Sequence, residues 1–102
     1  MIRVIATIEL AAGRRDAFLK LFHVLVPKVQ AEEGCLDYGP LVDVPTNISA
    51  QPAVRPNVVT VVEAWESVEA LETHLMAPHM LDYRKAAEGL VMRVTLQVLE
   101  PA

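Results

Sequence analysis

One segment in the C-terminal half of the chain carries side chains suited to acid–base chemistry on an aromatic compound: Glu63, Trp65, His74, His79 and Tyr83. Glu63 and Trp65 are two residues apart in an apolar stretch that is typical of a β-strand, and such side chains share one face of the strand. A carboxylate therefore lies beside the only tryptophan of the chain. These residues provide an acid, a base, a phenol and a flat aromatic wall, which predicts chemistry on an aromatic substrate without a bound cofactor.

The histidines do not form a recognisable metal motif. His74 and His79 are five residues apart with Pro78 between them, whereas two imidazoles that share an ion on one helix lie at positions i and i+4. The single cysteine, Cys35, is distant in sequence, and the four glycines are isolated, so there is no glycine-rich phosphate loop. We therefore expect neither a metal nor a nucleotide cofactor.

The two candidate acid–base residues each have a structural alternative. On position alone, a histidine such as His74 on an amphipathic helix is more often a hydrogen-bonded, half-buried residue than a base, and His79 is the alternative base. Glu63 is unusual because carboxylates are depleted in strands. It would either orient a group of the site or form a cross-strand ion pair with Arg93 or Arg3.

The aromatic candidates also have two interpretations. Trp65 would be either a wall of a pocket or a plain core residue. Tyr38 would pack in the core with its hydroxyl at the edge, or its hydroxyl would meet a ligand. Tyr83 and Arg84 share a helical piece, where Arg84 is expected in solvent and a role near a bound phenolate is the weaker alternative.

The elements that must position these side chains follow from periodicity. Alternating apolar residues predict strands, and spacing of three and four residues predicts helices. Ser67 is a favourable N-cap and Pro78 divides the second helix into two pieces. We expect strands at residues 2–10, 35–44, 58–66 and 92–99, helices at 14–32 and from 67 to Gly89, and a loop at 45–57. This β-α-β-β-α-β order predicts an α+β, ferredoxin-like fold with a four-stranded antiparallel sheet and both helices on one face.

Composition predicts a homodimer. The 102 residues form one domain, 1–102, of which 53% are hydrophobic, with a mean hydropathy of +0.32. The third strand is apolar on both faces, at Val58, Val59, Val61 and Val62. An antiparallel sheet normally leaves one face in water, so we expect a second copy of the sheet to cover this one with two-fold symmetry.

Charge and segment length exclude several classes of function. The net charge of −4 and the isoelectric point near 5.2 argue against a nucleic-acid surface. No run reaches the length of a membrane span, and the N-terminus lacks the features of a signal peptide. A single cysteine fits a reducing compartment, so we expect a cytoplasmic protein.

Three stretches together carry a resemblance to a known family. They are AEEGCLDYGPLVD at 31–43, VVEAWESVEALETHLMAPHM at 61–80 and VTLQVLEP at 94–101. On these motifs the chain resembles the antibiotic biosynthesis monooxygenase superfamily, and within it the small quinol monooxygenases of the YgiN type. The resemblance implies a dimeric α+β barrel with a pocket between sheet and helices in each subunit. It also implies that His74 points into this pocket and that Tyr38 bonds a quinol oxygen.

The reaction implied by the resemblance is oxidation of a quinol or polycyclic phenol by dioxygen with no metal, flavin or haem. Dioxygen reacts slowly with closed-shell compounds, but a deprotonated hydroquinone can supply the electron itself. Haem-degrading relatives carry an asparagine in the first strand, where this chain has Ala6 and Thr7. This difference argues against haem breakdown. A cofactor-free isomerase of the same superfamily and a non-catalytic dimeric binding module for aromatic or quinone ligands remain the alternatives.

Overall fold

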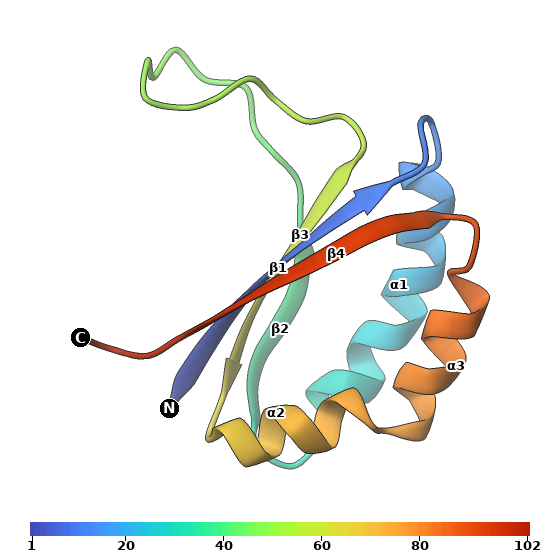
Figure 1. Ribbon diagram of the computed structural model, residues 1–102, viewed down its shortest axis with the longest axis vertical. Coiled ribbons are helices and arrows are strands. Elements are labelled where there is room, and N and C mark those ends of the chain that lie inside the picture. Colours follow the sequence, from blue (N-terminus) through green and yellow to red (C-terminus); the bar gives the residue numbers. More distant parts are fainter.

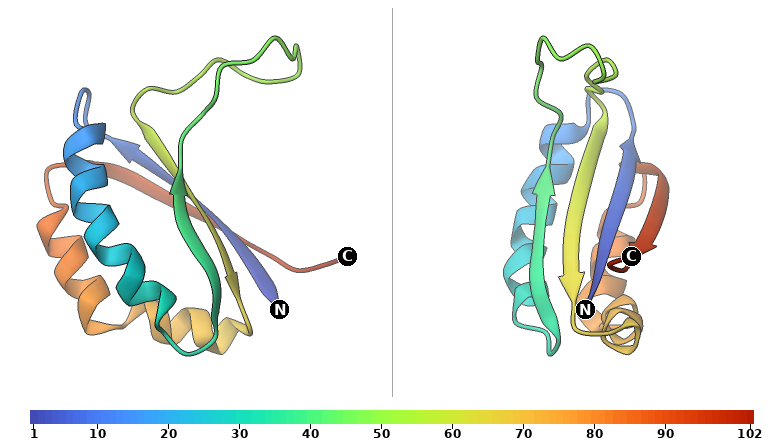
Figure 2. Two further views of the ribbon diagram at one scale, coloured as in Figure 1. Left: turned by 180° about the vertical axis from the view of Figure 1, so that it is seen from behind. Right: turned by 90° about the vertical axis from the view of Figure 1, so that its left-hand side faces the viewer.

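The computed structural model describes all 102 residues and has a four-stranded antiparallel sheet with three helices. The helices lie on one face of the sheet (Figures 1 and 2). The strand order across the sheet is β2-β3-β1-β4. The elements are β1 (Ile2–Leu10), α1 (Arg15–Gln30), β2 (Cys35–Leu41), β3 (Val58–Trp65), α2 (Val68–Leu75), α3 (Pro78–Ala86) and β4 (Val91–Leu99). The predicted ferredoxin-like fold is confirmed, with the second helix present as two separate helices.

Local sequence signals account for the break between α2 and α3. The Ser67 hydroxyl accepts a hydrogen bond of 3.1 Å from the amide of Ala70, which caps the start of α2. Pro78 is the first residue of α3, where its missing N–H costs no helical hydrogen bond. Ala77, just before it, is extended as a pre-proline residue prefers. The chain therefore turns sharply and brings α3 back towards α1.

The second strand ends at Leu41, three residues before the predicted end at Val44. Strand β2 lies at the edge of the sheet, which explains how it accommodates Pro40 without losing a ladder hydrogen bond. Beyond Leu41 the backbone leaves the sheet and enters the long loop of residues 42–57, which projects away from the helices (Figure 1).

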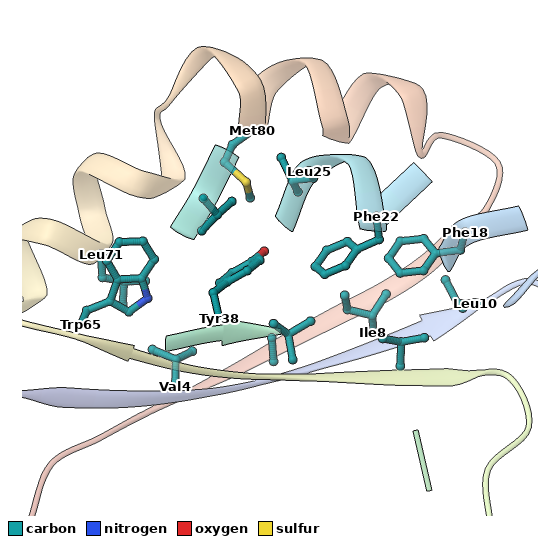
Figure 3. Close-up of a cluster of buried hydrophobic side chains, with 14 of the residues drawn as sticks. Val4, Ile8, Leu10, Phe18, Phe22, Leu25, Tyr38, Trp65, Leu71 and Met80 are labelled. Carbon is teal, nitrogen blue, oxygen red and sulfur yellow. The ribbon is translucent and has the colours of Figure 1, made fainter. Parts of the chain in front are cut away.

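The hydrophobic core fills the space between the sheet and the helices (Figure 3). Val4, Val59 and Val61 contribute from the two central strands, and Phe18 and Phe22 contribute from α1. The Phe18 and Phe22 rings stack with centroids 5.3 Å apart. None of the three helices is both long and apolar enough to cross a lipid bilayer.

Strand β4 differs from the other strands because little covers it. Val94, Leu96 and Val98 pair with the core residues of β1 and so face the helix side, yet they are 50%, 43% and 49% exposed. On the opposite face of the sheet, Ile5 and Val62 are only half-buried. The β4 end of the space between sheet and helices is therefore open.

Candidate active site

A largely apolar cavity of about 440 Å³ lies between the sheet and the helices. Its walls include Ala6 and Ile8 of β1, Met80 of α3, and Val94 and Leu96 of β4. Cavities of roughly 300–1,000 Å³ lined by apolar groups with a few polar ones are typical of small-molecule sites. In the single chain the cavity is open along β4.

Six titratable side chains line the cavity: the exposed Arg84 and Glu88, and four that are buried or half-buried, Tyr38, Glu63, His74 and Tyr83. These four come from β2, β3, α2 and α3, so the fold brings together residues that lie up to 45 positions apart. Every fully buried side-chain nitrogen or oxygen has a hydrogen-bond partner. The Nε2 atom of His74, the Oε2 atom of Glu63 and the two tyrosine hydroxyls have no hydrogen-bond partner in the protein, so none of them is fully buried.

His74 is held from behind by a carboxylate. Its Nδ1 atom lies 2.8 Å from Oε2 of Glu32, and Nε2 of His79 lies 2.7 Å from the same oxygen. Because a carboxylate only accepts hydrogen bonds, Nδ1 of His74 is the donor and Nε2 carries the free lone pair. Burial lowers the pKa of His74, whereas the hydrogen bond and negative charge of Glu32 act in the opposite direction.

Glu63 is paired with Trp65, as their shared strand face predicted. The indole Nε1 donates a 2.9 Å hydrogen bond to Oε1 of Glu63. Burial raises the pKa of Glu63 to about 7, against the lowering effect of this hydrogen bond. The alternative ion pair with Arg93 or Arg3 does not form, because both arginines are exposed on the opposite side of the sheet and Arg93 instead lies 3.7 Å from Glu9.

Two of the predicted site residues lie outside the cavity wall. Trp65 is fully buried behind His74, with ring centroids 4.6 Å apart, and does not line the cavity. His79 lies on the far side of Glu32 and borders a separate hollow between α1 and α3. Trp65 therefore supports Glu63 and His74 from inside the core, and His79 supports Glu32 from the outer side.

The two tyrosines are suited to donate hydrogen bonds. Burial raises the pKa of Tyr38 far above its ordinary value and that of Tyr83 to about 12. Both hydroxyls therefore keep their protons at neutral pH. The Tyr38 ring stands 5.5 Å from the His74 ring and 5.8 Å from that of Phe22, which places it in the middle of the core (Figure 3).

Sequence reasoning missed Glu32. The residue precedes Glu33 and Gly34, and this stretch was interpreted only as the end of a helix and as part of a family motif. Glu32 is 42 positions before His74, and no periodic spacing links residues at that distance. The only local signal is an acidic residue beside a glycine that turns the chain. No group of three or more His, Cys, Asp or Glu side chains is arranged to hold a metal ion.

Known proteins match this chain over most of its length. Residues 1–86 match the family model described as "Antibiotic biosynthesis monooxygenase". The chain is 40% identical over 103 residues to the Escherichia coli protein named "Probable quinol monooxygenase YgiN", covering 99% of this chain and 98% of that protein. A crystal structure of a Pseudomonas aeruginosa protein has a TM-score of 0.81 and 28% identity over 99% of this chain and 93% of that one. A Mycobacterium tuberculosis structure has a TM-score of 0.79 and 26% identity, covering 99% and 94%.

Proposed function

The chain belongs to the antibiotic biosynthesis monooxygenase family, as its motifs predicted, and we propose that it oxidises a quinol or a related polycyclic phenol with dioxygen and without a bound cofactor. The observation that carries this proposal is the cavity. The apolar space of about 440 Å³ is lined by His74, Glu63 and two tyrosines. These residues offer an imidazole nitrogen, a carboxyl oxygen and two phenolic hydroxyls that have no hydrogen-bond partner in the protein. An apolar cavity suits a flat aromatic ring, and the four polar atoms suit its oxygens.

The first step is proton transfer to His74. Its Nε2 atom accepts a proton from a substrate hydroxyl, and the tyrosine hydroxyls donate to the oxyanion that forms. The electron-rich quinolate then gives one electron to dioxygen. The resulting radical and superoxide combine into a peroxide on a ring carbon. In an apolar cavity the oxyanion and peroxide are stabilised by the fixed donors more strongly than by water.

The second step breaks the O–O bond. The proton on His74 passes to the outer peroxide oxygen, and the ring carbon loses its hydrogen as a proton to a base of the site. One oxygen stays on that carbon, and the outer oxygen leaves as hydroxide, which takes the ring-carbon proton from the base and becomes water. One quinol and one dioxygen thus give one hydroxylated quinone and one water, with all four electrons supplied by the substrate. Glu63 is placed to hold the second proton, because its pKa near 7 lets it accept or release a proton at neutral pH.

The assembly that completes the site is proposed to be a homodimer. Val94 and Leu96 line the cavity and remain exposed, and the face of the sheet away from the helices carries half-buried Ile5 and Val62. A second copy with two-fold symmetry would cover such apolar surface. Sedimentation at micromolar concentration should then give about twice the 11.2 kDa mass of one chain.

The test of the proposed reaction compares aerobic and anaerobic solutions of a reduced naphthoquinone. With metal-free protein in air, the quinol should disappear faster than in buffer, and ¹⁸O₂ should place one labelled oxygen in the product. Without oxygen the protein should bind the quinol and leave it unchanged. Binding in air with no oxygen consumption would contradict the proposal and indicate a binding module.

A further inference from the structure

The carboxylate of Glu32 joins two imidazoles that belong to different helices. A single oxygen, Oε2, lies 2.8 Å from Nδ1 of His74 on α2 and 2.7 Å from Nε2 of His79 on α3. The Glu32 side chain is only 12% exposed. A largely buried carboxylate that accepts two hydrogen bonds is held in one position, because moving it would leave a buried charge without its partners.

The backbone around Glu32 is fixed from both sides. Glu32 lies in the turn between α1 and β2, where its amide donates to the Val29 carbonyl at 2.9 Å and its own carbonyl accepts from the Cys35 amide at 3.2 Å. Two residues later, the Gly34 carbonyl accepts from the Glu66 amide at 2.9 Å. The turn thus joins α1, the start of β2 and the residue that follows β3.

Gly34 shows how tightly this turn packs on α2. Its φ of +83° is a conformation that favours glycine, and a Cβ at this position would lie 2.7 Å from Cβ of Ala70. Ala70 is one helical turn before His74. The turn that carries Glu32 therefore packs directly on the helix that carries His74.

We propose that Glu32 is the positioning residue of His74: it holds the ring proton on Nδ1 and turns Nε2 into the cavity, while His79 holds the carboxylate in place from the other side. This inference rests on the proposed function, in which Nε2 receives the substrate proton. When the imidazolium forms, the Glu32 carboxylate lies beside it and stabilises its charge, as the carboxylate partner of a catalytic histidine does. Glu32 does not itself touch the substrate.

The charged and titratable groups around His74 make this arrangement testable by pH. Glu32 is the one that favours the imidazolium through a direct hydrogen bond, whereas burial and the neighbouring His79 and Arg84 oppose it. Removing its charge should lower the pKa of His74 further. The groups that face or neighbour the ring are Glu32 from the turn, Tyr38 from β2, Glu63 from β3, and His79 and Arg84 from α3.

The experiment compares Glu32→Gln with Glu33→Gln, an adjacent and exposed carboxylate that bonds neither histidine. In the parent, ¹⁵N NMR of the His74 ring should show the Nδ1–H form. Glu32→Gln should shift the His74 titration to lower pH and lower kcat by roughly tenfold to a hundredfold, with KM little changed. The acid limb of the pH–rate profile should move to lower pH by the same amount as the NMR titration. Glu33→Gln should reproduce the parent in every measurement.

Three outcomes would overturn the proposal. The parent ring could carry its proton on Nε2, which needs no variant to observe. Glu32→Gln could leave the titration of His74 unchanged, or it could lower kcat without moving the pH profile, as general loosening of the site would. If the parent oxidises no naphthoquinol, the proposed function fails, but the tautomer and titration of His74 still decide whether Glu32 positions it. If Glu32→Gln does not fold, the position of the ring proton in the parent remains the test: a proton on Nδ1 of His74 supports the proposal, and a proton on Nε2 overturns it.

Discussion

Two carboxylates show opposite behaviour in this small protein. Glu63 lies in the core beside the cavity, where burial raises its pKa to about 7 and its hydrogen-bond donor is the indole of Trp65. Asp43 lies where the long loop leaves the sheet, and hydrogen bonds from Arg55 hold its pKa at about 2. A neutral donor leaves the buried carboxyl able to titrate near neutrality, whereas a guanidinium keeps the outer one charged.

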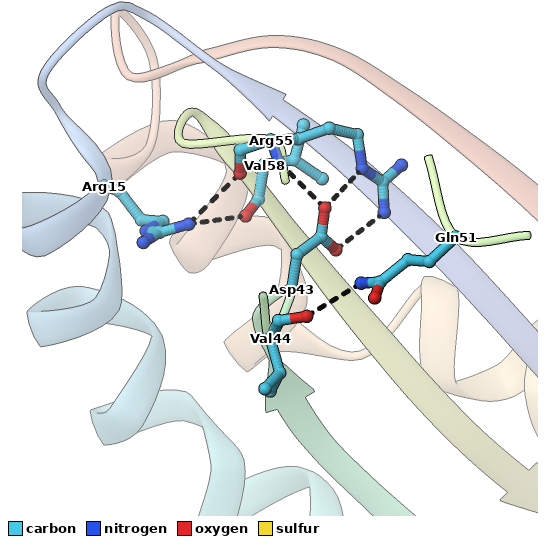
Figure 4. Close-up of polar contacts among 6 residues, drawn as sticks. All are labelled: Arg15, Asp43, Val44, Gln51, Arg55 and Val58. Atoms are coloured by element: carbon cyan, nitrogen blue, oxygen red, sulfur yellow. Dashed lines mark hydrogen bonds and ion pairs between the residues drawn. The ribbon is translucent and has the colours of Figure 1, made fainter. Parts of the chain in front are cut away.

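The outer carboxylate fastens the ends of the loop (Figure 4). Asp43 accepts 2.9 Å hydrogen bonds from Nε, Nη2 and the backbone amide of Arg55. On the other side, Arg15 donates to the carbonyls of Arg55 and Val58 at 3.3 and 3.4 Å. These contacts close the loop on itself and lie away from the cavity. Glu63 can therefore exchange a proton near neutral pH, as its proposed role requires, whereas Asp43 stays charged and holds the loop.

The largest expected effect comes from removing His74, the proposed base. His74→Ala should lower the rate of quinol oxidation by roughly a hundredfold to ten-thousandfold, because the substrate hydroxyl loses its proton acceptor. Quinol binding measured by calorimetry should change little. The control is His23→Ala, which alters an exposed histidine of α1 and should leave the rate unchanged. Equal rates in both variants would show that His74 is not the base of the reaction.

The next largest effect is expected in the pH dependence of stability, which should differ between Glu63 and Asp43. Burial makes the folded chain hold the Glu63 proton up to about pH 7, whereas the unfolded chain releases it near its ordinary value of 4.5. The folded state binds more protons in that interval, so this group destabilises the fold as the pH rises through it. The free energy of unfolding of Glu63→Gln minus that of the parent should therefore increase by about 3 kcal/mol from pH 4 to pH 8.

Urea unfolding of both proteins at the two pH values measures this change. The paired difference cancels the other titrating groups. A difference that stays constant with pH would mean that Glu63 titrates as a surface carboxylate does, and the contrast with Asp43 would disappear.

A smaller effect is expected from the turn between α1 and β2, which carries Glu32 and packs on α2. Gly34→Ala should destabilise the protein by about 1–3 kcal/mol more than Gly89→Ala. Both glycines have a φ of +83°, but a Cβ on Gly89 meets nothing within 4 Å, whereas one on Gly34 meets Ala70. The shared φ makes the difference in thermal midpoint a measure of packing at the turn alone. Equal shifts would show that the turn can move away from α2.

The smallest effect is expected at the outer carboxylate. Asp43→Asn should leave turnover and the global unfolding midpoint at the parent values, because the loop does not reach the cavity. It should increase hydrogen exchange at the Arg55 amide, which donates to Asp43. Asp82→Asn, at an exposed residue of α3, serves as the control. A marked loss of activity in Asp43→Asn would mean that the loop takes part in the site.

The fold was predictable because its signals are local. The alternation of residues 2–10, the cap at Ser67 and the proline at 78 each specify an element from a few neighbouring residues. The pair of Glu63 and Trp65 was predictable for the same reason, since two residues apart on a strand fixes a shared face.

The rest of the site depends on contacts that sequence spacing does not encode. Glu32 meets His74 only because the turn after α1 packs on α2. Trp65 was expected either in the cavity wall or in the core, and its position behind His74 is set by the crossing of α2 over the end of β3. Strand β2 ends at Leu41, and just beyond it Asp43 bonds Arg55, which lies 12 residues away.

The sheet order has a consequence for how the chain reaches this structure. Strand β1 is synthesised first, yet its neighbours β3 and β4 lie more than 45 and 80 residues further along the chain. Pairings between such distant segments carry a large loop-closure cost and fold slowly. The sheet can be completed only when β4 has left the ribosome. Until β3 is available both edges of β1 are unpaired, and the edge that pairs with β4 stays unpaired until β4 follows. During synthesis, this first strand is therefore the segment most exposed to wrong pairing with other chains.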